Sequence, residues 1–173
     1  MAQEFTVSLK SIIDEHSLEV IHTPEDPANI YISDIDVNRP GLQLAGFYEY
    51  FDNNRIQIIG NSETAYLNQC GAEIRIQRLK KFFSMKPAAV IVSRGLEVAD
   101  QMKEYAETYG VPLLRSEEST STFTSKLVAY LSLQLAPRIT RHGVLIEVYG
   151  EGMLILGDSG IGKSETAIEL IKR

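Results

Sequence analysis

The chain has 173 residues, 44% of them hydrophobic and 23% charged, a composition typical of a globular protein. Its net charge of −6 argues against a surface for nucleic acid. No apolar run approaches 18 residues and no basic-then-apolar leader is present, so we expect a cytoplasmic protein with no membrane partner. Cys70 is the only cysteine, which excludes an intrachain disulfide and suits a reducing compartment.

The first 60 residues predict short elements separated by turns. Asn38–Gly41 contains the Pro-Gly pair that usually interrupts regular structure. The segment 55–60 alternates polar and apolar residues and ends in glycine, which indicates a strand. The expected elements are a helix over 7–15, strands over 18–22, 30–32 and 55–60, and a short helix over 42–48.

The middle of the chain predicts alternating strands and helices. The run 88–92 is apolar without alternation, which is typical of a strand covered on both faces. Ser119 has the position of a helix N-cap and Gly110 that of a C-cap. We read the basic run 75–81 as a solvated helix face. The expected elements are helices starting at 62–64 and over 71–83, 98–109 and 119–135, and strands over 88–92 and 111–114. This order predicts an α/β fold with a mainly parallel sheet.

Beyond Pro137 the pattern changes to a hairpin, with strands over 142–149 and 153–156 and a turn at 150–152. We place one domain at 1–133 and the beginning of a second at 134–173. Two strands and one helix cannot bury an independent core. We therefore expect either a fragment, or a tail that rests on the first domain or on another copy.

The hairpin leads into a sequence that fits G-x-x-x-x-G-K-[ST], the phosphate-binding loop. The glycines let backbone N–H groups point at phosphate oxygens, and the following helix directs its positive end at the same anion. The lysine would contact the β- and γ-phosphates, and the serine hydroxyl would bind Mg²⁺. The alternative is an ordinary glycine-rich turn. The candidate nucleotide-binding residues are Gly157, Asp158, Ser159, Gly160, Ile161, Gly162, Lys163 and Ser164.

Several sequence blocks in this order resemble the HPr kinase/phosphorylase family along the whole chain. The blocks are Asn38–Gly46, Arg55–Gly60, Ser93–Glu97, Leu135–Arg138, His142–Leu145 and Gly157–Ala167. The resemblance implies a bacterial enzyme that phosphorylates a serine of the phosphocarrier HPr with ATP or pyrophosphate and Mg²⁺. It also implies the reverse reaction, in which inorganic phosphate releases pyrophosphate. It further implies an N-terminal domain like the first domain of Mur ligases, a P-loop kinase domain like phosphoenolpyruvate carboxykinase, regulation by fructose-1,6-bisphosphate, and a homohexamer.

Carried over by position, the resemblance gives His142 and Lys163 catalytic roles and makes Ser164 the Mg²⁺ ligand. Arg138 and Arg141 flank the histidine and are candidates to face phosphate, although all three could be ordinary surface residues. The family also has a pair of aspartates after the loop helix, an acidic Mg²⁺ ligand and an HPr-contacting segment, and none lies within residues 1–173. Because phosphoryl transfer needs these parts together, we expect this polypeptide alone to lack kinase turnover.

Two other functions remain open. The first domain could be a binding or assembly module without catalysis, with Arg94 and Arg115 near the carboxyl ends of adjacent strands as an anion site. The plainer interpretation makes these two arginines loop residues. A small-molecule P-loop kinase is the other alternative, and the long segment before the loop argues against it.

Overall fold

The computed structural model describes residues 5–172. Contacts divide the chain into two compact units, the first ending at Ala136 and the second beginning at Pro137. No helix among residues 5–172 is both long enough and apolar enough to span a membrane.

A five-stranded sheet forms the centre of the first unit, in the strand order β2-β7-β6-β5-β4. Four neighbouring strands are parallel, and β2 pairs antiparallel with β7 at one edge. The expected mainly parallel α/β fold is therefore confirmed. The strands are β2 (Glu19–His22), β4 (Val37–Asn38), β5 (Ile56–Ile59), β6 (Ala89–Val92) and β7 (Leu113–Arg115), and a separate antiparallel pair joins β1 (Val7–Ser8) to β3 (Tyr31–Ile32).

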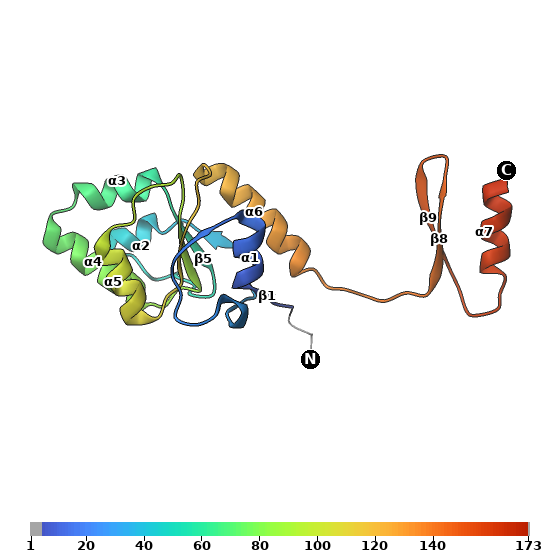
Figure 1. Ribbon diagram of the computed structural model, residues 1–173, viewed down its shortest axis with the longest axis horizontal. Helices are drawn as coiled ribbons and strands as arrows, with labels where there is room; N and C mark the ends of the chain where they lie inside the picture. The colour runs from blue at the N-terminus through green and yellow to red at the C-terminus, as the bar shows by residue number, and fades with distance from the viewer. Residues whose placement is uncertain (1–4, 173) are drawn as a thin grey trace. The chain divides into compact units, whose positions relative to one another are not determined.

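Helices cover both faces of this sheet (Figure 1). Successive parallel strands are added in one direction, so right-handed connections place their helices on the same face. That face carries α2 (Gly41–Ala45), α3 (Asn61–Gln69), α4 (Ala72–Ser84) and α5 (Asp100–Tyr109). The opposite face carries α1 (Leu9–His16) and α6 (Thr120–Gln134), and a short 3₁₀ helix, η1, spans Pro27–Asn29.

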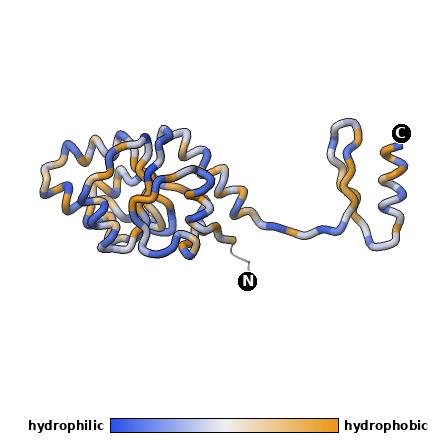
Figure 2. The backbone as a smooth tube through the Cα atoms, viewed as in Figure 1, coloured by the Kyte–Doolittle hydropathy of each residue, from blue (hydrophilic) through white to orange (hydrophobic). Residues whose placement is uncertain are grey.

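The central strands β5 and β6 are buried at every residue, and Figure 2 shows hydrophobic segments gathered in the middle of this unit. The expectation of a strand covered on both faces is confirmed for 89–92, whereas Ala88 precedes the strand and is half-buried. The polar residue of β5 is also inside: Gln57 is fully buried and accepts a hydrogen bond of 2.8 Å from Asn38 Nδ2 on β4. The alternation in 55–60 therefore does not mark a solvent-exposed face.

Helix caps in the first unit follow the expected residues. Ser119 Oγ accepts a hydrogen bond from the backbone N–H of Thr122, and Gly110 ends α5 with φ = 65°. Several boundaries were wrong, among them the end of the helix expected over 42–48, which spans Gly41–Ala45. The helix expected from residue 7 begins at Leu9, because Val7 and Ser8 pair with β3. Asn38, expected to interrupt the chain, belongs to β4 and pairs with β5.

The second unit is a hairpin followed by a helix, as expected. Strand β8 (Gly143–Val148) pairs antiparallel with β9 (Glu151–Leu156), and α7 spans Lys163–Lys172. The turn lies at Tyr149 and Gly150, both with positive φ, rather than at 150–152. Positive φ at both central residues matches the right-handed twist of a two-residue hairpin.

Candidate functional site

The glycine loop, residues 157–162, joins β9 to α7, so the strand–loop–helix order that the motif requires is present. Gly160 and Gly162 have φ of 84° and 91°, a left-handed conformation that side chains disfavour. Thr166 fastens the end of the loop to the helix, since its N–H and Oγ1 both donate to Gly162 O, at 2.9 and 3.0 Å. The loop therefore curves back onto the amino end of α7, where free N–H groups and the helix dipole favour an anion.

The side chain of Lys163, the first residue of α7, folds back onto the start of the glycine loop. Lys163 Nζ donates to the carbonyl oxygens of Gly157 and Asp158, at 2.7 and 2.6 Å. Ser164 is exposed, and within residues 5–172 its hydroxyl makes no hydrogen bond. An ammonium held over the loop and an unengaged hydroxyl beside it fit a magnesium-bound polyphosphate: a cation for the phosphates and an oxygen ligand for the metal.

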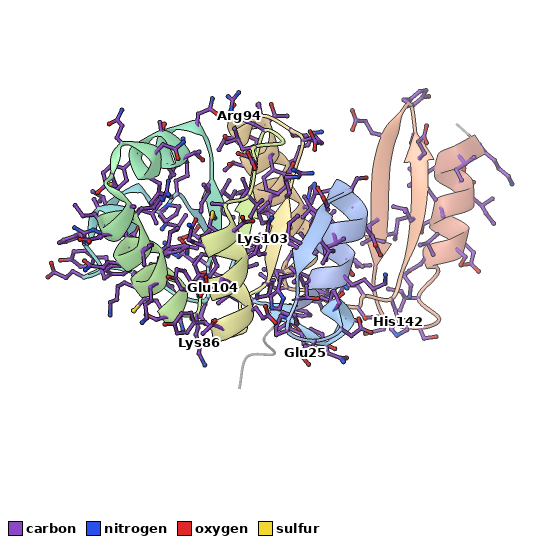
Figure 3. The ribbon with its side chains drawn as sticks, turned by 60° about the vertical axis from the view of Figure 1, so that its left-hand side comes forward. Glu25, Lys86, Arg94, Lys103, Glu104 and His142 are labelled. Atoms are coloured by element: carbon purple, nitrogen blue, oxygen red, sulfur yellow. The ribbon has the colours of Figure 1, made fainter. Side chains whose placement is uncertain are left out.

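The histidine expected at the site lies at the same end of the hairpin as the loop. Gly143 pairs with Leu156, so His142 stands beside the point where β9 runs into Gly157, and Figure 3 shows it at that end of the hairpin. Its ring is exposed, as is Arg141 beside it. Arg138 is also exposed, in the segment that precedes the hairpin. The hairpin register thus brings His142 to the loop, and the two arginines are surface residues of the same unit.

Of the two arginines considered in the first unit, Arg115 has an acidic partner. Arg115 is the last residue of β7, and its guanidinium binds Glu19 on β2, with Nε 2.6 Å from Oε2. Arg94 is exposed in the loop after β6, and its backbone N–H donates to Glu118 O. Arg115 is thus paired with Glu19, and Arg94 is an exposed loop residue.

One feature of the first unit was missed by the sequence analysis. A cavity of about 420 Å³ lies at the carboxyl ends of β5 and β6, where α3, α4 and α5 meet. Arg75 lines it, and its Nε is buried without a hydrogen-bond partner, which contradicts the reading of 75–81 as a wholly solvated face. The alternation of basic and apolar residues in that run does not reveal which arginine faces inward.

These observations define the class: an α/β protein whose second unit carries a glycine-rich loop between a strand and a helix. The sequence matches two family profiles in tandem, described as "HPr Serine kinase N terminus" over residues 7–131 and "HPr Serine kinase C-terminal domain" over residues 133–173. The chain belongs to the HPr serine kinase family.

Curated relatives agree. The chain is 49% identical to an HPr kinase/phosphorylase of Lachnoclostridium phytofermentans, over 98% of this chain and 55% of the relative. It is 50% identical to that of Clostridium perfringens strain SM101, over 96% of this chain and 54% of the relative. It is 46% identical to the HPr kinase/phosphorylase of Caldicellulosiruptor bescii, over 98% of this chain and 54% of the relative. The chain thus spans about half the length of the curated relatives it matches.

A solved structure shares the fold of much of the chain. It contains the CBS and DRTGG domains of the regulatory region of Clostridium perfringens pyrophosphatase, complexed with its activator diadenosine tetraphosphate. The TM-score is 0.52 at 19% identity, over 75% of this chain and 50% of that structure's chain. At this identity the likeness concerns fold alone.

Proposed function

We propose that this chain is the N-terminal half of a cytoplasmic HPr kinase/phosphorylase. The complete enzyme would transfer a phosphoryl group from ATP or pyrophosphate to a serine of HPr, and would use inorganic phosphate to remove it. The observation that carries the proposal is the curved loop with Lys163 held over it, in a chain of this family. The family resemblance adds a homohexamer and control of bacterial sugar use.

Each loop residue has a role in this proposal. The backbone N–H groups of 157–162 and the amino end of α7 would hold the β- and γ-phosphates. Lys163 would exchange its two loop carbonyls for phosphate oxygens, since a charged acceptor makes the stronger hydrogen bond. Ser164 would supply an oxygen to Mg²⁺, which neutralises charge on the transferring group. His142 would stand next to the phosphates, within reach of the incoming serine or phosphate.

The group that takes the proton from the serine hydroxyl is not supplied by these residues. The family resemblance assigns it to an aspartate beyond residue 173. Positioning and charge neutralisation act together in phosphoryl transfer, and loss of one part costs orders of magnitude in rate. Residues 1–173 alone are therefore proposed to bind nucleotide without turning it over.

A phosphorylation assay with two protein lengths tests the proposal. A chain extended to the length of the relatives, mixed with HPr and ATP-Mg²⁺, is expected to form phosphoserine on HPr, and added phosphate should reverse this with release of pyrophosphate. Residues 1–173 alone should form none. Lys163→Ala in the longer chain should abolish formation, whereas Lys172→Ala, at the far end of α7, should not. Absence of phosphoserine with the longer chain would refute the function, and clear phosphoserine with residues 1–173 would refute the need for the missing part.

A further inference from the structure

The cavity of the first unit is built like a small-molecule site. Its volume of about 420 Å³ falls in the range of ligand pockets, and it opens at the carboxyl ends of two parallel strands, where open α/β sheets bind their ligands. Its apolar wall comes from the sheet and from all three surrounding helices, and includes Ile59, Val92, Leu67, Leu79 and Met102. Such a wall favours a ligand with an apolar body.

One cation lines this cavity without a partner. Arg75 extends from the first turns of α4, and its Nε is buried and forms no hydrogen bond. Within residues 5–172 its guanidinium makes no ion pair either. A buried donor without an acceptor costs free energy comparable to a lost hydrogen bond, more for a charged group, so this site is unsatisfied as it stands. A carboxylate fits a guanidinium in a two-pronged geometry and would satisfy it.

The opposite rim supplies further donors. Ala99, Asp100 and Gln101 line the cavity and form the amino end of α5, and no side chain caps that end. The backbone N–H groups of a helix start, with the positive end of its dipole, attract an anion. These groups lie at the same cavity as Arg75, so two independent features favour negative charge there.

Acidic side chains at the rim limit how much negative charge is accepted. Asp100 is bound to Lys103 Nζ at 3.0 Å, and Glu97 is exposed at the rim. With one unpaired cation and an uncompensated carboxylate nearby, a singly charged anion is favoured over a polyphosphate.

We propose that this cavity binds a small organic monocarboxylate, with its carboxylate on Arg75 and its apolar body against Leu67, Leu79 and Met102. The site lies wholly within the first unit and uses no residue of the phosphate loop. It is therefore a second ligand site, beyond the proposed kinase function and independent of it.

Binding of hexanoate to residues 1–173, followed by ¹H–¹⁵N NMR, tests the proposal. We expect saturable shifts centred on the amides of Leu96, Gln101 and Asn68, with hexanol, the uncharged counterpart, binding about tenfold more weakly or worse. Arg75→Gln should weaken the binding of hexanoate by about tenfold or more, to the affinity of hexanol. Lys80→Gln removes the same charge from an exposed position of α4 that does not line the cavity, and should leave hexanoate binding unchanged.

A second variant tests the cavity without changing the charge. Asn68 is exposed at the rim, so the fold should tolerate Asn68→Trp, and the larger side chain should obstruct the binding of hexanoate. Gln69→Trp is the control, because Gln69 is exposed but does not line the cavity, and this variant should leave hexanoate binding unchanged. Shifts that do not saturate, equal binding of hexanol and hexanoate, or unchanged binding in both Arg75→Gln and Asn68→Trp would overturn the proposal.

Discussion

At the scale of single residues, Glu63 joins the start of α3 to the loop that follows β4. Its carboxylate is buried and accepts hydrogen bonds from Arg39 Nη2 at 2.8 Å and from the backbone N–H of Gly60 at 2.9 Å. Burial alone would raise the pKa of Glu63, but these two donors and the charge of Arg39 outweigh it and lower the pKa. The carboxylate therefore stabilises the fold in its charged form.

Glu63→Gln is expected to lower the free energy of unfolding by about 1–3 kcal/mol at pH 7, because two donors lose a charged acceptor. Because the folded pKa lies below the ordinary value of 4.5, this stabilisation is complete above pH 4.5 and is lost as the pH falls through the folded pKa. Urea unfolding of wild type and variant at pH 7 and pH 3.5 measures it. Glu73→Gln, exposed in the first turn of α4, is the control. The same difference in the free energy of unfolding between wild type and Glu63→Gln at both pH values would contradict a stabilising role of the charged carboxylate.

His16 is expected to make stability depend on pH in a higher window. Its ring packs edge-on against Phe123 and Tyr130, with centroids 5.7 and 5.4 Å away, and its Nε2 has no hydrogen-bond partner. Burial lowers the pKa of His16, against the opposing charges of Glu15 and Glu118; Lys126 lowers it further. The unfolded chain therefore binds a proton first, so stability should fall as the pH drops below 6.5. In the His16→Phe variant, the free energy of unfolding, measured with urea, should fall less steeply between pH 6.5 and pH 5 than in wild type. An unchanged pH dependence would contradict this role of His16.

Residue-scale burial was the hardest property to predict. Gln57 lies in a buried strand and Arg75 lines a cavity, whereas polarity in the local sequence usually signals an exposed side chain. Their surroundings come from segments distant in sequence: β4 supplies the partner of Gln57, and α3 and α5 close the cavity around Arg75. The strand–loop–helix order around residues 157–162, by contrast, was predictable because the glycines and the lysine of the motif lie within eight consecutive residues.

At the scale of elements, the conformation of the glycine loop, residues 157–162, depends on glycine at its turn. Gly162 has φ = 91°, and α7 begins at the next residue. Any side chain there strains the backbone by about 1–2 kcal/mol. The loop would then relax its curve, and the N–H groups proposed to hold the phosphates would separate.

Gly162→Ala is expected to weaken ATP-Mg²⁺ binding by about tenfold, the equivalent of that strain. Isothermal titration calorimetry measures the affinity, and the far-ultraviolet circular dichroism spectrum of the chain should be unaltered. Gly152→Ala is the control, because this strand glycine has φ outside the positive range and open space where a Cβ would point. Equal losses of affinity in the two variants would show that the loop conformation is not what binds.

Element boundaries were predictable where a single residue sets them, as at the Ser119 and Gly110 caps. They were wrong where distant pairing decides: Val7–Ser8 and Val37–Asn38 are two-residue strands that exist only because β3 and β5 lie beside them. No local pattern of two residues carries that information.

At the scale of the molecule, the two units differ in how much core they contain. The first has two hydrophobic clusters, one on each face of its sheet. In residues 137–172 the buried side chains are Ile146 and Ala167, and large apolar residues such as Leu145, Leu154 and Ile168 are more than half exposed. A hairpin and one helix bury too little apolar surface to offset the entropy of ordering them.

Hydrogen exchange should therefore divide the chain at the unit boundary. We expect amides of β5 and β6 to be protected up to global unfolding, and those of β8, β9 and α7 to exchange by low-energy local opening. Mass spectrometry of peptides from 55–92 and 143–172 measures this. Similar protection in both sets would mean that the second unit is stabilised more than its own contacts provide.

The central claim is that residues 157–164 form a cradle for the phosphates of a nucleotide, and titration of ATP-Mg²⁺ into this chain tests it most directly. The structure of the loop predicts saturable binding that Lys163→Ala weakens by at least about tenfold, through loss of charge-assisted hydrogen bonds, while Lys172→Ala at the other end of α7 has no effect. No saturable binding, or the same affinity in Lys163→Ala as in wild type, would contradict the claim.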